Sequence, residues 1–274
     1  TTVTETLVLD TIPNPIEVAP VTADNTVAQS EYEAGFTVGG TTAGGATVTL
    51  AIGSSTLTTT AAADGSWSVV IPSGTIPTGT YQASVTASTV DAAGNASSST
   101  RSFTVDTEVS VAFAPDPIEG DNIVNLTEAA DGVTLTGSSE AGSTVSVTWG
   151  STTLAATTQA DGSWSVTFPA GSIPADGTTT ATVTATDAAG NTTSATRTIE
   201  VDTQVSVAFS SAAVEGDNIV NLAEAADGVT LTGTSEAGST VSVAWGSTTL
   251  AATTQADGSW SGTFPAGSIP ADGT

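Results

Sequence analysis

The stretch TVSVTWGSTTLAATTQADGSWSVTF, residues 144–168, decides the fold of this chain. Apolar side chains alternate with Thr and Ser in its first and last segments, which is typical of half-buried strands. These apolar side chains are Val145, Val147 and Trp149 in the first segment and Trp164, Val166 and Phe168 in the last. Asp161-Gly162 between them suits a tight hairpin. We therefore expect the two apolar sides to meet in a core, with the tryptophans as packing residues rather than a platform for sugars.

The sequence around this stretch continues in the same manner. Short alternating segments rich in Thr, Val and Ser are separated by Gly, Asp, Asn and Pro, as in an all-β sandwich. We expect seven strands and no helix in one module. The expected strands are 109–113, 133–138, 144–149, 153–158, 163–168, 179–186 and 193–201. The predicted fold class is all-β, with tandem immunoglobulin-like sandwiches in a linear array.

The module repeats with a fixed period. The Asp-Thr pairs that begin at Asp10, Asp106 and Asp202 lie 96 residues apart, and residues 106–178 differ from 202–274 at ten of 73 positions. Such an array is typical of a modular rod or spacer. We expect repeats at 10–105 and 106–201 and an incomplete one at 202–274 that lacks its last two strands. Residues 1–9 align with the last strand of a repeat, so we interpret the chain as a window from a longer array.

The third repeat is expected to be the least stable. Gly262 replaces the counterpart of Val166 on the core side of a strand, which removes buried apolar area and adds backbone freedom. Repeat 1 differs elsewhere, because Ile52 stands where the other copies have Trp149 and Trp245.

Charge and composition exclude several classes of function. The chain has 28 acidic residues against two basic ones, a formal net charge of −26, with no Cys and no His. So anionic a chain is not expected to bind nucleic acid or an anionic membrane surface. Without Cys or His, zinc and haem sites are excluded and only oxygen ligands remain. No apolar run reaches the roughly 20 residues that cross a bilayer.

The order of strands in an immunoglobulin-like sandwich predicts which acids meet. At the entrance of the middle repeat it gathers Glu140, Asp161, Asp187 and the junction residue Asp106. Carboxylates this close repel one another when no Lys or Arg pairs them. Calcium takes six to eight oxygen ligands in irregular geometry, so we expect Ca²⁺ between Asp106, Glu140 and Asp187. Such an ion would join the exit of one domain to the entrance of the next.

Each acidic motif also has a simpler interpretation, which stays open here. Asp187 to Asn191 can be a β-turn held by local hydrogen bonds, and Asp161 is well suited to forming a turn. Solvated turn and metal ligand are equally good interpretations of the two Gly-Asp-Asn motifs and the Glu that follows each. These residues are Asp121, Asn122 and Glu128 in one copy and Asp217, Asn218 and Glu224 in the next.

Taken together, four motifs carry a resemblance: Val-Asp-Thr at the junctions, Gly-Asp-Asn followed by Glu-Ala, Asp-Gly-Ser-Trp-Ser, and Asp-Ala-Ala-Gly-Asn. The set resembles bacterial Ig-like repeats of large biofilm-associated and RTX-type surface adhesins. The resemblance implies β-sandwich extenders, type I secretion and calcium at domain junctions. The implied ligands are Asp106, Glu140 and Asp187, with Asn191 shaping the loop.

The other junctions depart from this pattern. A site using Asp10 and Asp91 lacks one carboxylate, because Ala43 stands where Glu140 and Glu236 occur. A site using Asp202 and Glu236 lacks a counterpart of Asp187 within these residues.

We therefore expect a structural extender, extracellular on a bacterial surface or in a biofilm matrix, that mediates adhesion. Its partners would be neighbouring repeats and other copies in a fibre. Each repeat would add roughly 40 Å to the length of the array. Two alternatives stay open: Thr-rich strand faces that bind a glycan, ice or a protein, and self-assembly by strand donation. Without His, Cys or Lys as a base or nucleophile, no enzyme is expected.

Overall fold

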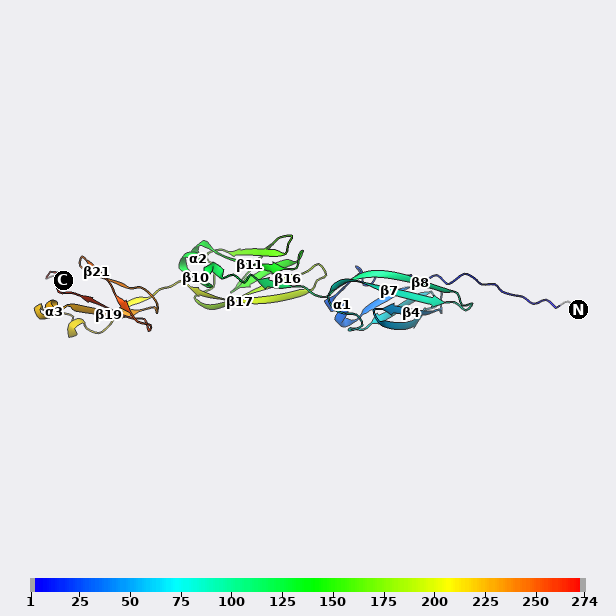
Figure 1. The fold of residues 1–274 in the computed structure, drawn as a ribbon, viewed down its shortest axis with the longest axis horizontal. Helices are drawn as coiled ribbons and strands as arrows, with labels where there is room; N and C mark the ends of the chain where they lie inside the picture. Colours follow the sequence, from blue (N-terminus) through cyan, green and yellow to red (C-terminus); the bar gives the residue numbers. More distant parts are fainter. Residues whose placement is uncertain (1–2, 272–274) are drawn as a thin grey trace. The chain divides into compact units, whose positions relative to one another are not determined.

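The computed structural model describes residues 3–271, which form two compact units (Figure 1). The first unit reaches Val201 and contains residues 10–105 and 106–201, here called repeat 1 and repeat 2. Asn125–Thr127 group with the second unit, which otherwise begins at Asp202 and contains repeat 3. The exact domain boundaries stay a prediction.

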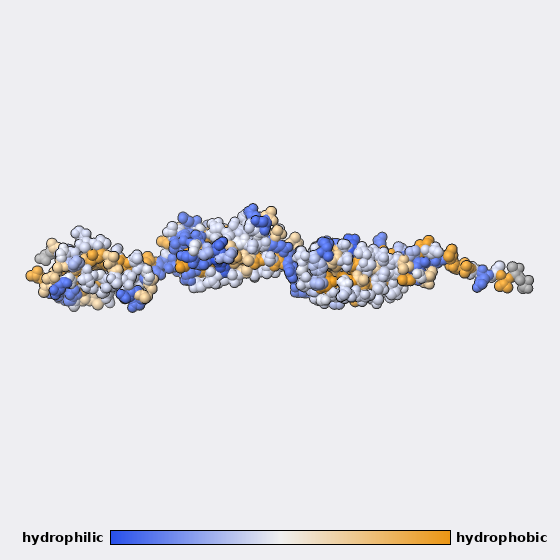
Figure 2. Space-filling model, in the orientation of Figure 1, coloured by the Kyte–Doolittle hydropathy of each residue, from blue (hydrophilic) through white to orange (hydrophobic). Residues whose placement is uncertain are grey.

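Residues 3–16 form neither a helix nor a strand. Val3, Leu7 and Leu9 of this segment are exposed, whereas Ile16 at its end is buried. Figure 2 shows hydrophobic atoms along this N-terminal tail. That residues 1–9 are the last strand of a preceding repeat stays a prediction, and residues 1 and 2 lie outside the described residues.

Repeat 1 is a sandwich of two sheets. Pairing is antiparallel except between β2 and β8, which run parallel. One sheet has the order β1 (Glu17–Val18), β3 (Phe36–Thr41), β6 (Ser66–Ile71), and the other has the order β2 (Thr26–Ala28), β8 (Ala96–Asp106), β7 (Thr80–Val90), β4 (Thr47–Ile52), β5 (Ser55–Thr60). Alternate side chains of both sheets share one buried cluster, as period-two patterning requires.

Repeat 2 has the same two-sheet architecture around its own core. One sheet has the order β14 (Thr157–Thr158), β15 (Ser163–Phe168), β11 (Val133–Ser139), β9 (Val111–Phe113). The other has the order β10 (Ile123–Asn125), β17 (Thr192–Asp202), β16 (Gly177–Thr186), β12 (Thr144–Trp149), β13 (Thr152–Ala155). The predicted all-β, tandem immunoglobulin-like class is confirmed.

Repeat 3 forms a smaller set of strands in the described residues. One sheet has the order β18 (Val207–Phe209), β19 (Val229–Ser235), β23 (Ser259–Phe264), β22 (Thr253–Thr254), and the other pairs β20 (Ser242–Trp245) with β21 (Thr248–Ala251). Its buried cluster is Val241, Val243, Trp260 and Phe264. This cluster has fewer members than the clusters of repeats 1 and 2.

The expectation that no helix forms was wrong. Each repeat contains one helix of six residues, and repeats 2 and 3 add a short 3-10 turn. These elements are α1 (Gln29–Ala34), α2 (Leu126–Asp131), α3 (Leu222–Asp227), η1 (Ile118–Gly120) and η2 (Val214–Gly216). In α3, Asn221 Oδ1 accepts from the amides of Ala223 and Glu224, and Glu224 accepts from the amide of Asn221. This reciprocal capping stabilises a helix too short to show a 3.6-residue period.

The strand expected over 153–158 is also corrected. It divides at Ala156 into β13 and β14, which belong to opposite sheets of repeat 2. The amide of Ala156 donates to the carbonyl of Val145 at 2.9 Å, so the backbone stays hydrogen-bonded while it crosses between the sheets. The expected strands 144–149 and 163–168 have the observed bounds.

The tryptophans are packing residues, as predicted. Trp67, Trp149, Trp164 and Trp260 are buried, and Trp149 meets Phe168 edge to face at 5.5 Å. The indole of Trp164 lies directly over Gly137, where any Cβ would overlap the ring and the carbonyl of Ala112. Glycine at position 137 therefore makes room for the tryptophan.

Candidate functional site at the junction of repeats 1 and 2

Three carboxylates from separate elements lie near the junction of repeats 1 and 2. Asp106 is the last residue of β8, Glu140 follows β11, and Asp187 follows β16. β12 pairs with β16 so that Thr144 lies opposite Thr186, which places the loop before β12, with Glu140, beside the loop after β16, with Asp187. That these three residues share a metal ion stays a prediction.

The pKa of Glu140 reflects its surroundings at this junction. Its side chain is partly buried, and burial is the main cause that raises the pKa of Glu140 above its ordinary value of 4.5. The negative charges of Asp106 and Asp187 raise that pKa further. The charge of Glu140 at neutral pH is therefore unfavourable in the folded chain.

The other two carboxylates already accept hydrogen bonds, Asp106 at one oxygen and Asp187 at both. Asp106 Oδ1 accepts from Thr80 Oγ1 at 2.9 Å. Asp187 Oδ1 accepts from the amide of Asn191 at 2.8 Å, and Asp187 Oδ2 accepts from Asn191 Nδ2 at 2.7 Å. Across residues 3–271, no three acidic side chains come close enough together to hold a metal. The donors have the chemistry that Ca²⁺ prefers, but they are not gathered into a coordination shell.

Asn191 and Thr107 connect the repeats directly. Asn191 Nδ2 donates to the carbonyl of Asp106 at 2.8 Å, and Asn191 Oδ1 accepts from the amide of Gln29 in repeat 1, also at 2.8 Å. Thr107 Oγ1 accepts from the amide of Gly79, and the amide of Thr107 donates to the carbonyl of Gly79. Both Asn191 and Thr107 are buried polar residues.

The same loop recurs at the start of repeat 1. Asp91 Oδ1 accepts from the amides of Ala93 and Asn95, and its other oxygen accepts from Asn95 Nδ2. The side-chain hydrogen bond from Asn95 is the largest cause that lowers the pKa of Asp91. Asp10 is exposed, and its carbonyl accepts from Asn95 Nδ2 at 3.3 Å.

Asp202 and Glu236 are the remaining pair of expected main ligands. Asp202 ends β17 and is exposed. Glu236 follows β19, and its amide donates to the carbonyl of Ser206 at 3.1 Å. The counterpart of Asp187 would lie beyond Thr274. Their role as ligands stays a prediction.

The Gly-Asp-Asn motifs make local turns. Asp121 Oδ1 accepts from the amide of Ile123, and Asp217 Oδ1 accepts from that of Ile219. Asn122 and Asn218 have positive φ and accept from the amides of Ile118 and Val214. Glu128 and Glu224 lie in α2 and α3.

Asp161 also makes a local turn. Its Oδ1 accepts from both the amide and the hydroxyl of Ser163, and these bonds lower the pKa of Asp161. Asp161 is not among the charges that raise the pKa of Glu140.

Arg197 was missed by the sequence analysis. Its guanidinium donates to the carbonyls of Ala114 and Asp116 and to Asn122 Oδ1, so it fastens the loop before η1 to β17. The sequence does contain a signal that could have identified Arg197. Arg101 and Arg197 are the only two basic residues of the chain, and they occupy equivalent positions in two repeats.

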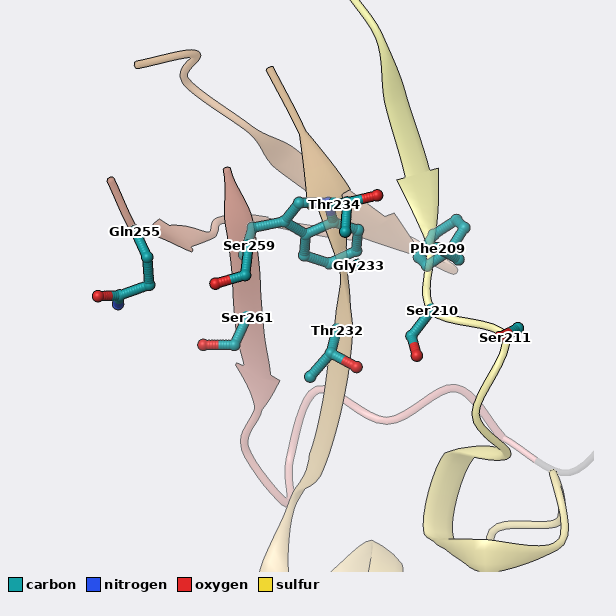
Figure 3. A pocket seen from close by; sticks show the side chains of 10 residues that line it. Phe209, Ser210, Ser211, Thr232, Gly233, Thr234, Gln255, Ser259 and Ser261 are labelled. Atoms are coloured by element: carbon teal, nitrogen blue, oxygen red, sulfur yellow. The ribbon is translucent and has the colours of Figure 1, made fainter. Parts of the chain in front are cut away.

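A hollow in the described surface lies in repeat 3 (Figure 3). It measures about 520 Å³, and Ser and Thr side chains line it beside the edge-to-face pair Phe209 and Trp260. Ser210 on its rim is the counterpart of Ala114, whose carbonyl receives Arg197 in repeat 2.

Fold and repeat define a tandem array of immunoglobulin-like domains. The model of the bacterial Ig-like domain family matches residues 21–107 and 118–203, more than half of the chain. The chain belongs to this family. No helix within residues 3–271 is long and apolar enough to cross a membrane.

Several solved structures are similar to the chain. A 1.5-MDa bacterial ice-binding adhesin is 27% identical, with 93% of this chain and 87% of that one covered and a TM-score of 0.46. A Ca²⁺-stabilised adhesin with which an Antarctic bacterium binds ice is 33% identical, with 94% and 67% covered and a TM-score of 0.46. A tetra-tandem repeat from the extending region of a large adhesion protein is 24% identical, with 92% and 66% covered and a TM-score of 0.34. No curated protein matches the chain.

Proposed function

We propose that these domains are an extender of a bacterial cell-surface adhesin or matrix fibre, and that calcium at the domain junctions stiffens it. The repeated domains support the extender, since repeats 1 and 2 each have their own core and each repeat adds length to the array. The four sequence motifs that resemble adhesin repeats support the proposal that the extender belongs to an adhesin. Localisation outside the cell and a role in adhesion or biofilm formation belong to the same proposal.

The observation that carries the calcium proposal is the unfavourable charge of Glu140. Two further carboxylates raise its pKa, Asp106 at the junction itself and Asp187 in repeat 2, and no hydrogen bond is among the causes of this pKa shift. A divalent cation would remove this repulsion. Ser143, in the same loop, has a buried hydroxyl without a hydrogen-bond partner in the described chain and is a further oxygen donor close in sequence.

Calcium binding would require side chains to turn. Asp187 now accepts two bonds from Asn191, and its carboxylate would have to share an oxygen with the ion. Glu140 could turn toward an ion most easily, because no hydrogen bond is among the causes of its pKa shift, whereas Asp106 and Asp187 both accept hydrogen bonds. Asp106, Glu140 and Asp187 are thus the proposed ligands of this junction.

Isothermal titration calorimetry of the whole chain with CaCl₂ tests this proposal. We expect saturable binding that Glu140→Gln weakens strongly, because the replacement keeps the shape of the side chain and removes its charge. Absence of binding at millimolar Ca²⁺ would remove calcium from the account and leave the extender without it.

A further inference from the structure

We propose that Asn191 is a clasp that fixes the junction of repeats 1 and 2 without a metal ion, and that the Asp-x-x-Gly-Asn loop is built to receive a backbone amide of the preceding domain. The clasp goes beyond the calcium proposal, because it consists only of hydrogen bonds between groups of the chain itself.

The side chain of Asn191 satisfies groups on both sides of the junction at once. It is 6% exposed, and its Oδ1 accepts from the amide of Gln29, while Nδ2 donates to the carbonyl of Asp106 and to Asp187 Oδ2. The orientation of the amide group is determined, since an amide can only donate and a carbonyl can only accept. A flipped side chain would lose all three bonds.

The segment between the repeats is held from both directions. Asp106 is bonded to Asn191 of repeat 2, and the next residue, Thr107, exchanges hydrogen bonds with Gly79 of repeat 1. Thr107 is 5% exposed. Because breaking these bonds in a buried place leaves polar groups without partners, the segment has few ways to bend.

Gln29 needs an acceptor outside its own helix, because the first amides of a helix have no carbonyl partner within it, and its acceptor lies in repeat 2. Gln29 is the first residue of α1, and the residue before it is Ala28, which has no side-chain acceptor. In α3 the residue before the helix is Asn221, which accepts from the amides of Ala223 and Glu224, the second and third residues of that helix, so a side-chain cap of this kind does not serve the position that Gln29 occupies. Asn191 therefore completes the hydrogen bonding of an element in the preceding domain.

The loop of residues 91–95 in repeat 1 has the same internal arrangement. Asn95 makes the same bonds to Asp91 and to the carbonyl of Asp10. In the described part of the chain no hydrogen bond reaches Asn95 Oδ1. The loop thus forms by itself and leaves one carbonyl oxygen for a backbone amide of another immunoglobulin-like domain.

Distance measurements on the full chain test the clasp. The chain has no Cys, so Ser54→Cys in repeat 1 and Ser151→Cys in repeat 2, both at exposed turns, place one nitroxide on each repeat. Pulsed electron paramagnetic resonance in EGTA then gives the distribution of distances. We expect Asn191→Ala to broaden this distribution, and Asn95→Ala, which removes the matching bonds inside repeat 1, to leave it unchanged. An Asn191→Ala distribution equal to that of the parent chain would overturn the clasp.

Gln29→Pro provides a second test that does not touch repeat 2. Proline suits the first position of a helix and removes the one amide that Asn191 accepts from, and Ala28 before it is already extended with ψ 166°. We expect broadening here too, with the circular dichroism of the parent chain retained. If Asn191→Ala prevents folding, Gln29→Pro decides alone, and an unchanged distribution refutes the clasp.

The clasp and the calcium proposal can be refuted independently of each other. The clasp is measured by the difference between variants and parent in EGTA. The calcium proposal is measured by the difference between Ca²⁺ and EGTA in the parent, so a parent that does not respond to Ca²⁺ leaves the clasp standing.

Discussion

At the scale of single residues, Glu140 is where charge opposes folding. Because its pKa is raised in the folded chain, the folded state binds the proton more tightly than the unfolded state. The stabilising effect of the proton is present below pH 4.5 and is lost as the pH rises through the folded pKa. Glu140→Gln should therefore stabilise the junction in EGTA at pH 7, by about 0.5 kcal/mol for a partly exposed group.

Hydrogen exchange of peptides covering the loop after β11 measures this effect locally. The difference between Glu140→Gln and the parent should grow from pH 4 to pH 7 in EGTA and reverse in saturating Ca²⁺. A difference that does not depend on pH would mean that Glu140 feels no repulsion from Asp106 and Asp187.

Asp187 and Asp91 are matched residues with different surroundings. Each accepts the same bonds from an Asn four residues on, but Glu140 has no counterpart beside Asp91. Asp187→Ala should cost repeat 2 about 1–2 kcal/mol in EGTA and also abolish the stabilisation by Ca²⁺. Asp91→Ala should weaken its own loop in repeat 1 and leave the response of repeat 2 to Ca²⁺ intact.

Thermal melting with and without Ca²⁺, resolved by calorimetry, separates the two effects. Equal loss of the calcium response in both variants would show that the response does not come from the junction of repeats 1 and 2.

At the scale of elements, β23 contains the substitution that we expect to make repeat 3 less stable, Gly262 in place of the valine found at the equivalent position 166. A Cβ on Gly262 would lie 3.8 Å from Ala252 Cβ and 3.9 Å from Val243 Cγ2, which are ordinary contacts. Gly262→Val should therefore fit and raise the free energy of unfolding of repeat 3 by about 1–2 kcal/mol through buried apolar area and lost backbone freedom.

Denaturant unfolding followed by Trp fluorescence measures this gain. The reverse change in repeat 2, Val166→Gly, serves as the control and should destabilise its own repeat. A Gly262→Val chain less stable than the parent would mean that the site around Ala252 cannot accept the two methyl groups.

The elements also show how far sequence reasoning reaches. The bounds of β12 and β15 were predictable because core and solvent sides alternate strictly along them. Helices of six residues were missed, since caps such as Asn221 with Glu224 stabilise them rather than a periodic apolar face. The change of sheet at Ala156 has no signal, as Thr and Ala continue on both sides of it.

For the site, the order of strands predicted that Glu140 would meet Asp106 and Asp187. It could not predict the bond from Gln29 to Asn191, because that bond depends on how one domain meets the next. Sequence reasoning thus finds acids that share one end of a sandwich more readily than contacts between domains.

At the scale of the whole molecule, the proposed function depends on the length and stiffness of the tandem array. Each domain folds around its own core, so the junctions decide how far the chain extends. A junction held by Asn191 and relieved of charge repulsion by Ca²⁺ would transmit force with little bending, as an adhesin stalk requires.

Small-angle X-ray scattering of the 274-residue chain tests this claim most directly. We predict a longer maximum dimension and a narrower range of conformations in millimolar Ca²⁺ than in EGTA, with Glu140→Gln insensitive to the change. Identical scattering of the parent chain in Ca²⁺ and in EGTA would contradict it.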